Sequence, residues 1–175
     1  SQPIRVDMID KLTFKLSGRA VPALETQDKD AVRSFVVCGK PLPGHEVVVR
    51  DEMGSVLKDR AIGHIFVKGP SLMSGYYHNA QATDAVIAGD GFLATGDMGY
   101  LLDGEIVITG RAKDLILHNG RNIWPQDIEW AAEQVEPLKS GDVAAFAVEG
   151  DDGEDDVVVL VQCRVTTDAE IEKLR

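Results

Sequence analysis

Two dipeptides, Asp103-Gly104 and Asn119-Gly120, constrain the fold of this chain more than any other feature. The first joins residues 98–102 to residues 105–109, and the second joins residues 115–118 to residues 121–123. The two central residues of a tight hairpin turn need a positive φ, which Asn, Asp and Gly adopt most readily. We therefore predict two β-hairpins and hence antiparallel strand pairing.

Short runs of β-branched residues, punctuated by Gly and Pro, indicate further strands before the first hairpin. They occupy residues 34–38, 46–50 and 63–68, with turn sequences at residues 39–44 and 51–54. Strands of this length and spacing are typical of a small barrel or folded sheet. Residues 7–16 fit either a short strand or a turn of helix, and residues 80–87 fit a short helix.

The chain after residue 110 changes character. Pro125 predicts a helix start, because its missing N–H costs nothing in the first turn. Ile128, Ala131, Ala132 and Val135 share one face of that helix, and Pro137 is expected to end it. Two buried strands are predicted at residues 143–148 and 157–165, and a further helix is expected to begin near residue 167.

These elements predict an α+β fold with three parts. Residues 1–33 are expected to be the trailing segment of a larger domain. Residues 34–110 are predicted to form a small, distorted antiparallel β-barrel. Residues 111–175 are predicted to form part of a small α/β lobe, joined to the barrel by a hinge near residues 111–113.

Charge and cysteine usage narrow the function classes. The formal net charge of −11 argues against a nucleic-acid partner or an anionic membrane surface, both of which need a basic face. No apolar run approaches the length of about 20 residues that spans a bilayer. Cys38 and Cys163 lie in apolar runs without metal-ligand spacing, so we expect buried, reduced thiols and a cytoplasmic protein. The acidic run at residues 151–156 lacks the spacing of a calcium loop, and no metal site is predicted.

Three residues around the first hairpin are candidates for chemistry. Asp97 follows Thr95 and Gly96, and a carboxylate there can accept both hydroxyls of a vicinal diol or bond to its own turn. Arg111 offers a forked donor to phosphate or ribose oxygens, or forms a surface ion pair. Lys113 is either a solvated lysine or a pivot between two hairpins.

Taken together, the motifs resemble those of the acyl-adenylate-forming superfamily, which includes acyl-CoA synthetases, luciferases and the adenylation domains of peptide synthetases. The resemblance covers roughly residues 35–165. It rests on the sequences GKPLPG at 39–44, GHIFVKGP at 63–70, GYY at 75–77, FLATGD at 92–97, GRAKDLI at 110–116 and GRNIWPQDIE at 120–129.

The resemblance implies a role for each candidate residue. Asp97 would bind the ribose hydroxyls of ATP and of the acyl-adenylate, and Arg111 would contact the ribose or a phosphate. Lys113 would be the hinge on which the C-terminal lobe turns between the adenylation and thioester-forming steps. The parent enzyme would activate a fatty acid with ATP and Mg²⁺.

The acceptor of the acyl group is either an acyl carrier protein or coenzyme A. The sequence at 119–129 is more similar to fatty acyl-AMP ligases, which acylate a carrier protein. Many relatives have a lysine where Leu117 stands, and its absence mildly favours the carrier protein.

The family's phosphate loop, its Mg²⁺-binding glutamate motif and its C-terminal catalytic lysine are absent from these residues. We therefore expect an inactive piece of a larger ligase, with no catalytic residue and no cofactor of its own. The alternative is a natively short, non-catalytic nucleotide-binding or interaction module.

Overall fold

The computed structural model describes residues 3–118, 121–149 and 155–162. The chain divides into two compact units, residues 1–112 and 113–175. The predicted helix beginning near residue 167, the acidic run before residue 155 and Cys163 lie outside the described residues.

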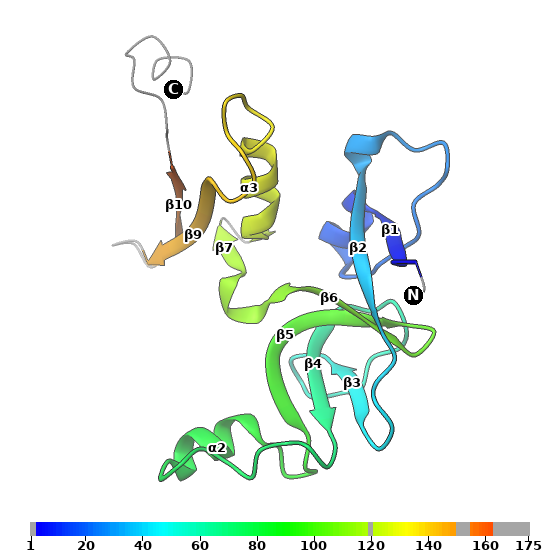
Figure 1. The fold of residues 1–175 in the computed structure, drawn as a ribbon, viewed down its shortest axis with the longest axis vertical. Coiled ribbons are helices and arrows are strands. Elements are labelled where there is room, and N and C mark those ends of the chain that lie inside the picture. Colours follow the sequence, from blue (N-terminus) through cyan, green and yellow to red (C-terminus); the bar gives the residue numbers. More distant parts are fainter. Residues whose placement is uncertain (1–2, 119–120, 150–154, 163–175) are drawn as a thin grey trace. The chain divides into compact units, whose positions relative to one another are not determined.

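The first unit is built on six antiparallel strands in the order β1-β2-β6-β5-β4-β3. Figure 1 shows β5 and β6 curving together as one long ribbon. The strands are β1 (Val6–Asp10), β2 (Val32–Gly39), β3 (Glu46–Arg50), β4 (Gly63–Lys68), β5 (Leu93–Leu102) and β6 (Glu105–Arg111). The short helices are α1 (Lys11–Ser17), the 3₁₀ turn η1 (Lys29–Ala31) and α2 (Ala80–Val86).

This sheet is open, so the predicted barrel is wrong in that respect. β1 and β3 are its two end strands and do not pair with each other within the described residues. The segment before residue 34 supplies both elements that its sequence allowed: a strand that pairs with β2, then helix α1, which begins where Asp10 caps the amide of Thr13. Antiparallel pairing and the Asp103-Gly104 hairpin are confirmed, with Leu102 opposite Glu105.

A buried ion pair ties distant parts of the first unit together. The guanidinium of Arg60 donates to both carboxylate oxygens of Asp7, each at 3.1 Å, and also to the carbonyl of Ala20 at 2.7 Å. The fully buried Tyr100 donates its hydroxyl to Asp7 at 2.6 Å. Asp7 lies on β1 and Tyr100 on β5, so this network links two strands that are not neighbours in the sheet.

The cysteine prediction is wrong for Cys38, whose side chain is exposed. Along β2 the side chains alternate, so that Arg33 and Phe35 are buried while Ser34, Val36 and Cys38 face outward. An apolar run therefore did not imply burial on both faces.

In the second unit, the described residues form two small antiparallel strand pairs and one α-helix. Its elements are the 3₁₀ turn η2 (Ala112–Asp114), which begins at the boundary, β7 (Ile116–His118), β8 (Arg121–Ile123), α3 (Pro125–Ala132), β9 (Val143–Glu149) and β10 (Asp155–Val161). β7 pairs with β8 as predicted, and β9 pairs with β10. α3 packs against β9, and the Glu129 carboxylate accepts the amide of Ala145 at 3.0 Å.

Two expectations for this unit need correction. α3 begins at Pro125 as predicted but ends at Ala132, so Val135 lies beyond it and is half exposed, as is Trp130. The strands at residues 143–148 and 157–165 were predicted to be buried, but among the side chains of β9 and β10 that the structure describes only Val143 and Ala145 are, and Leu160 is 57% exposed. A two-stranded sheet that meets a helix through one strand leaves much of its apolar surface uncovered.

Candidate functional site

Asp97 lies in a bulge of β5, a strand with neighbours on both sides. His64 pairs with Met98 and Phe66 pairs with Ala94, so the single residue Ile65 on β4 faces three residues on β5. Gly96, in the middle of the three, has a φ of +79°. A left-handed backbone favours glycine there, because a Cβ would be strained. Bulges of this kind redirect a side chain out of the regular sheet alternation.

The hydroxyl of Thr95 replaces the strand pairing that the bulge interrupts. It accepts the amide of Asp97 at 3.0 Å and donates to the carbonyl of Ile65, also at 3.0 Å. Both backbone groups would otherwise lack these partners inside the sheet, and unpaired buried backbone groups are costly. The Asp97 backbone is therefore fixed by a side chain two residues before it.

Arg111 lies directly opposite Asp97, on β6. Its Nε is 3.2 Å from Oδ1 of Asp97, and the side chains are 57% and 25% exposed. A second bulge sets this register: Met98 pairs with Gly110 but Gly99 pairs with Ile108, which leaves Thr109 as the extra residue. The structure thus brings together two of the three residues that the sequence singled out.

The backbones of β5 and β6 approach very closely beside this pair. A Cβ added to Gly99 would lie 2.1 Å from the carbonyl oxygen of Val107, so only glycine fits. Thr109 is buried, and its hydroxyl oxygen has no hydrogen-bond partner among the residues that the structure describes. Next to Asp97, the pairing of β5 with β6 therefore includes a close backbone contact at Gly99. It also includes, at Thr109, a buried hydroxyl that lacks a described hydrogen-bond partner.

The Asp97–Arg111 pair can bind a ligand because most of its hydrogen-bond donors and acceptors are unused. Among the described residues, Arg111 is the one side chain that binds the Asp97 carboxylate, and it does so through one oxygen. A carboxylate can accept about four hydrogen bonds, and a guanidinium can donate five. Both groups are partly exposed, so a ligand with adjacent hydroxyls can bind the carboxylate while the guanidinium contacts a neighbouring oxygen.

Lys113 is exposed and lies in η2, at the first position of the second unit. It lines a cavity of about 220 Å³ within that unit, together with Asp114, Gln126 and Glu129 and with the strand residues 145–147. Its predicted role as a hinge stays a prediction.

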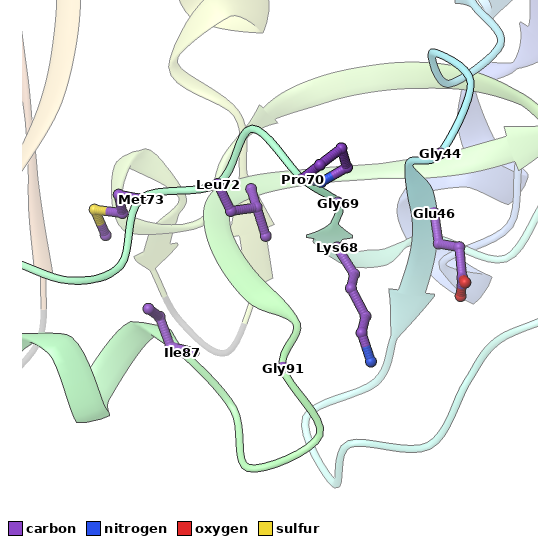
Figure 2. A pocket seen from close by; sticks show the side chains of 9 residues that line it. All are labelled: Gly44, Glu46, Lys68, Gly69, Pro70, Leu72, Met73, Ile87 and Gly91. Carbon is purple, nitrogen blue, oxygen red and sulfur yellow. The ribbon is translucent and has the colours of Figure 1, made fainter.

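A larger cavity, of about 450 Å³, lies at the other end of β4 and β5 (Figure 2). Leu72, Met73 and Ile87 line one side of it, and Lys68 and Glu46 line the other. The Lys68 ammonium donates to the carbonyl of Asp90 at 2.8 Å and lies 5.4 Å from the centre of the Phe92 ring. None of the three residues predicted from the sequence lines this cavity.

Neither a metal-ligand cluster nor a membrane-spanning helix occurs in the described ranges. No group of three or more His, Cys, Asp or Glu side chains there is placed to bind a metal ion, so we assign no metal ligand to these residues. No helix in the same ranges is long and apolar enough to cross a membrane.

Comparisons with known proteins place this chain in a family. The profile of the AMP-binding enzyme family matches residues 18–77. A putative acyl-CoA synthetase of Caulobacter vibrioides is 51% identical over 162 residues, covering 92% of this chain and 28% of that protein. The chain belongs to the AMP-binding enzyme family.

Two further comparisons concern a relative with a more specific name and a solved structure with a similar fold. A medium-chain-fatty-acid–acyl-carrier-protein ligase of Moorena producens is 38% identical over 141 residues, which is 75% of this chain and 24% of that protein. A structure solved in work on fatty acyl-adenylate ligases of E. coli and L. pneumophila matches with a TM-score of 0.85 at 42% identity, covering 99% of this chain and 30% of that one. This match confirms the α+β fold class. The chain spans less than a third of the length of each of these relatives.

The sequence reasoning missed the part played by Thr95. Its signal was present in the Thr-Gly-Asp string, but a hydroxyl two residues before an acid has no fixed meaning until the bulge is known. The nearest partner outside the string, the carbonyl of Ile65, is 30 residues away along the chain.

Proposed function

We propose that the protein to which these residues belong is an ATP-dependent ligase that activates fatty acids. A carboxylate oxygen of the acid attacks the α-phosphorus of ATP, forming the acyl–O–P bond while the bond to the β-phosphate breaks and pyrophosphate leaves. The sulfur of a thiol then attacks the acyl carbon, forming a thioester as AMP leaves, and the thiol proton passes to solvent or a base. ATP with Mg²⁺ is the expected cofactor.

One observation carries this proposal for the chain itself: Asp97 and Arg111 face each other at 3.2 Å, partly exposed, on a bulged ribbon. In our proposal the carboxylate binds the ribose hydroxyls of ATP and of the acyl-adenylate, and the guanidinium contacts the ribose or a phosphate. The names of the Moorena and fatty acyl-adenylate ligase relatives support a fatty acid as the acyl substrate, and that of the Caulobacter relative supports an acyl substrate.

The two-unit organisation supports a hinge at Lys113. The first unit ends at Ala112 and the second begins at Lys113. A few exposed residues between two compact units can absorb a large change in φ and ψ. We propose that the second unit turns at this point between the two half-reactions.

The acceptor is proposed to be an acyl carrier protein, with coenzyme A as the second candidate. Leu117 is exposed on β7, and the resemblance noted from the sequence implies that a lysine assisting thioester formation is missing at this position. The Moorena relative is named for a carrier protein, whereas the Caulobacter relative is named for coenzyme A. Supplying each thiol to the full-length gene product decides between them, and rapid acyl-CoA formation would reject the carrier protein. A cytoplasmic location stays a prediction.

The experiment that tests the proposal is fatty-acid-dependent exchange of pyrophosphate into ATP by the full-length gene product. We expect Asp97→Ala to lower kcat/KM for ATP by at least about tenfold, the effect of losing one good hydrogen-bonding anchor. Asp90→Ala is the matched control, because Asp90 is another partly exposed aspartate of the first unit that pairs with an arginine, Arg50. Unchanged exchange in Asp97→Ala would reject the assignment. We expect the 175 residues alone to form no acyl-AMP.

A further inference from the structure

We propose that Thr95 is a positioning residue, whose hydroxyl sets the direction in which Asp97 presents its carboxylate. This inference rests on the proposed nucleotide-binding role of Asp97. It starts from the observation that one hydroxyl accepts the Asp97 amide and donates to the Ile65 carbonyl, both at 3.0 Å.

The position of the bulge makes this hydroxyl necessary. β5 lies between β4 and β6, so its backbone groups face partners on both sides. On the β4 side the regular pairing stops at Ala94 and resumes at Met98. The Thr95 hydroxyl fills that interval by bonding to one donor and one acceptor at once, which a hydroxyl can do and a methyl group cannot.

Without the Thr95 hydroxyl, the bulged backbone of residues 95–97 would lose two hydrogen bonds, and a regularly paired strand would become a competing arrangement. A shift of pairing by one residue moves a side chain to the opposite face of a sheet. Pairing of Gly96 with Ile65 would be such a one-residue shift relative to the His64–Met98 pair, and it would turn the Asp97 carboxylate away from Arg111. Gly96, with its φ of +79°, allows the bulged backbone but does not favour it over a regularly paired strand. The hydrogen bonds of the Thr95 hydroxyl favour the bulge.

The test compares Thr95→Val with Thr95→Ser in the full-length gene product. Valine keeps the shape of the side chain and removes the hydroxyl, whereas serine keeps the hydroxyl. We expect Thr95→Val to raise KM for ATP about tenfold with little change in kcat, because the ribose is held equally in the ground and transition states. Thr95→Ser should stay within about threefold of the native KM.

A second readout separates positioning from general loosening. The native enzyme should discriminate ATP from 2′-deoxy-ATP, since Asp97 is proposed to bind the ribose hydroxyls. Thr95→Val should reduce that discrimination and Thr95→Ser should retain it. Thr109→Val is the matched control on the neighbouring strand, because the Thr109 hydroxyl has no partner among the described residues, and it should leave both KM and discrimination unchanged.

The outcomes distinguish this inference from the proposed function. If Asp97→Ala loses ATP binding and discrimination while Thr95→Val keeps both, Thr95 does not position Asp97 and the proposed function stands. If Asp97→Ala also keeps both, the proposed function fails. Equal losses in Thr95→Val and Thr109→Val would indicate general loosening and overturn the inference. Should Thr95→Val fail to fold, Thr95→Ala is subject to the same expectation and the same outcomes.

Discussion

Two of the aspartate–arginine pairs in the first unit, Asp7–Arg60 and Asp97–Arg111, differ in their bonding and in their burial. In the Asp7–Arg60 pair, both carboxylate oxygens accept hydrogen bonds from the guanidinium, Tyr100 donates a third, and the Asp7 and Arg60 side chains are 9% and 25% exposed. In the Asp97–Arg111 pair, one ion-pair contact of 3.2 Å joins side chains that are 25% and 57% exposed. The Asp7 carboxylate is therefore occupied by hydrogen bonds that hold the fold together. The Asp97 carboxylate and the Arg111 guanidinium leave most of their acceptor and donor positions open to a ligand.

This difference indicates which carboxylates are available to bind a ligand and which ones stabilise the fold. A buried and fully bonded acid is strongly destabilising to disrupt, because its partner is left without compensation. An exposed pair contributes little to stability and is free to exchange its partner for a ligand. The comparison predicts that variants of the two pairs will separate stability from nucleotide binding.

The largest expected effect is that of Asp7→Ala on stability. It leaves the Arg60 guanidinium and the Tyr100 hydroxyl without their acceptor, and we expect the free energy of unfolding to fall by about 3 kcal/mol. Asp97→Ala, the matched variant of the exposed pair, should change it by less than about 1 kcal/mol. Urea denaturation measures both, and similar losses in the two variants would remove the distinction between the pairs.

The next effect depends on pH. Burial raises the pKa of the Tyr100 hydroxyl well above its usual range, and the hydrogen bond to Asp7 raises it further. The unfolded chain then loses this proton above about pH 10 while the folded protein keeps it. Stability from this group is therefore complete below pH 10 and declines above it, by about 1.4 kcal/mol per pH unit.

Tyr100→Phe isolates this contribution. The stability advantage of the native protein over Tyr100→Phe should be constant from pH 7 to 9 and shrink as the pH rises above 10. Denaturation midpoints across that range provide the measurement. A difference that does not change with pH would show that Tyr100 ionises as it does in water.

The smallest expected effects are those of replacing each arginine by lysine. Arg60→Lys loses the forked contact with Asp7 and the bond to the Ala20 carbonyl, so we expect a loss of about 1–2 kcal/mol. Arg111→Lys should cost less than about 0.5 kcal/mol, and added salt should screen its contribution further. Equal losses of stability in Arg60→Lys and Arg111→Lys, measured by thermal unfolding, would contradict the expectation that the more exposed pair contributes less to stability.

The sequence predicted the local features of the site well. Asp97 and Arg111 were found from a string of residues, and the Asp103-Gly104 hairpin placed them just beyond the ends of two paired strands, at residues 98–102 and 105–109. Their exact pairing depends on the bulges at Thr95–Asp97 and Thr109, which a residue pattern of period two does not reveal. Motifs thus identified the residues, and the strand irregularities determined their geometry.

The long-range features were not predictable in the same way. Arg60 and Tyr100 lie 53 and 93 residues from Asp7 along the chain, and no local pattern connects them. The exposure of Cys38 and of β10 likewise depends on which faces other elements cover. Apolar composition alone does not carry that information.

The most direct test of the central claim is the affinity of the full-length gene product for AMP, measured by calorimetry for the native protein, Asp97→Ala and Arg60→Lys. If the exposed pair is the nucleotide site and the buried pair is structural, Asp97→Ala will weaken AMP binding by at least about tenfold, and Arg60→Lys, measured where it is folded, will bind AMP as the native protein does. Native affinity in Asp97→Ala would contradict the account.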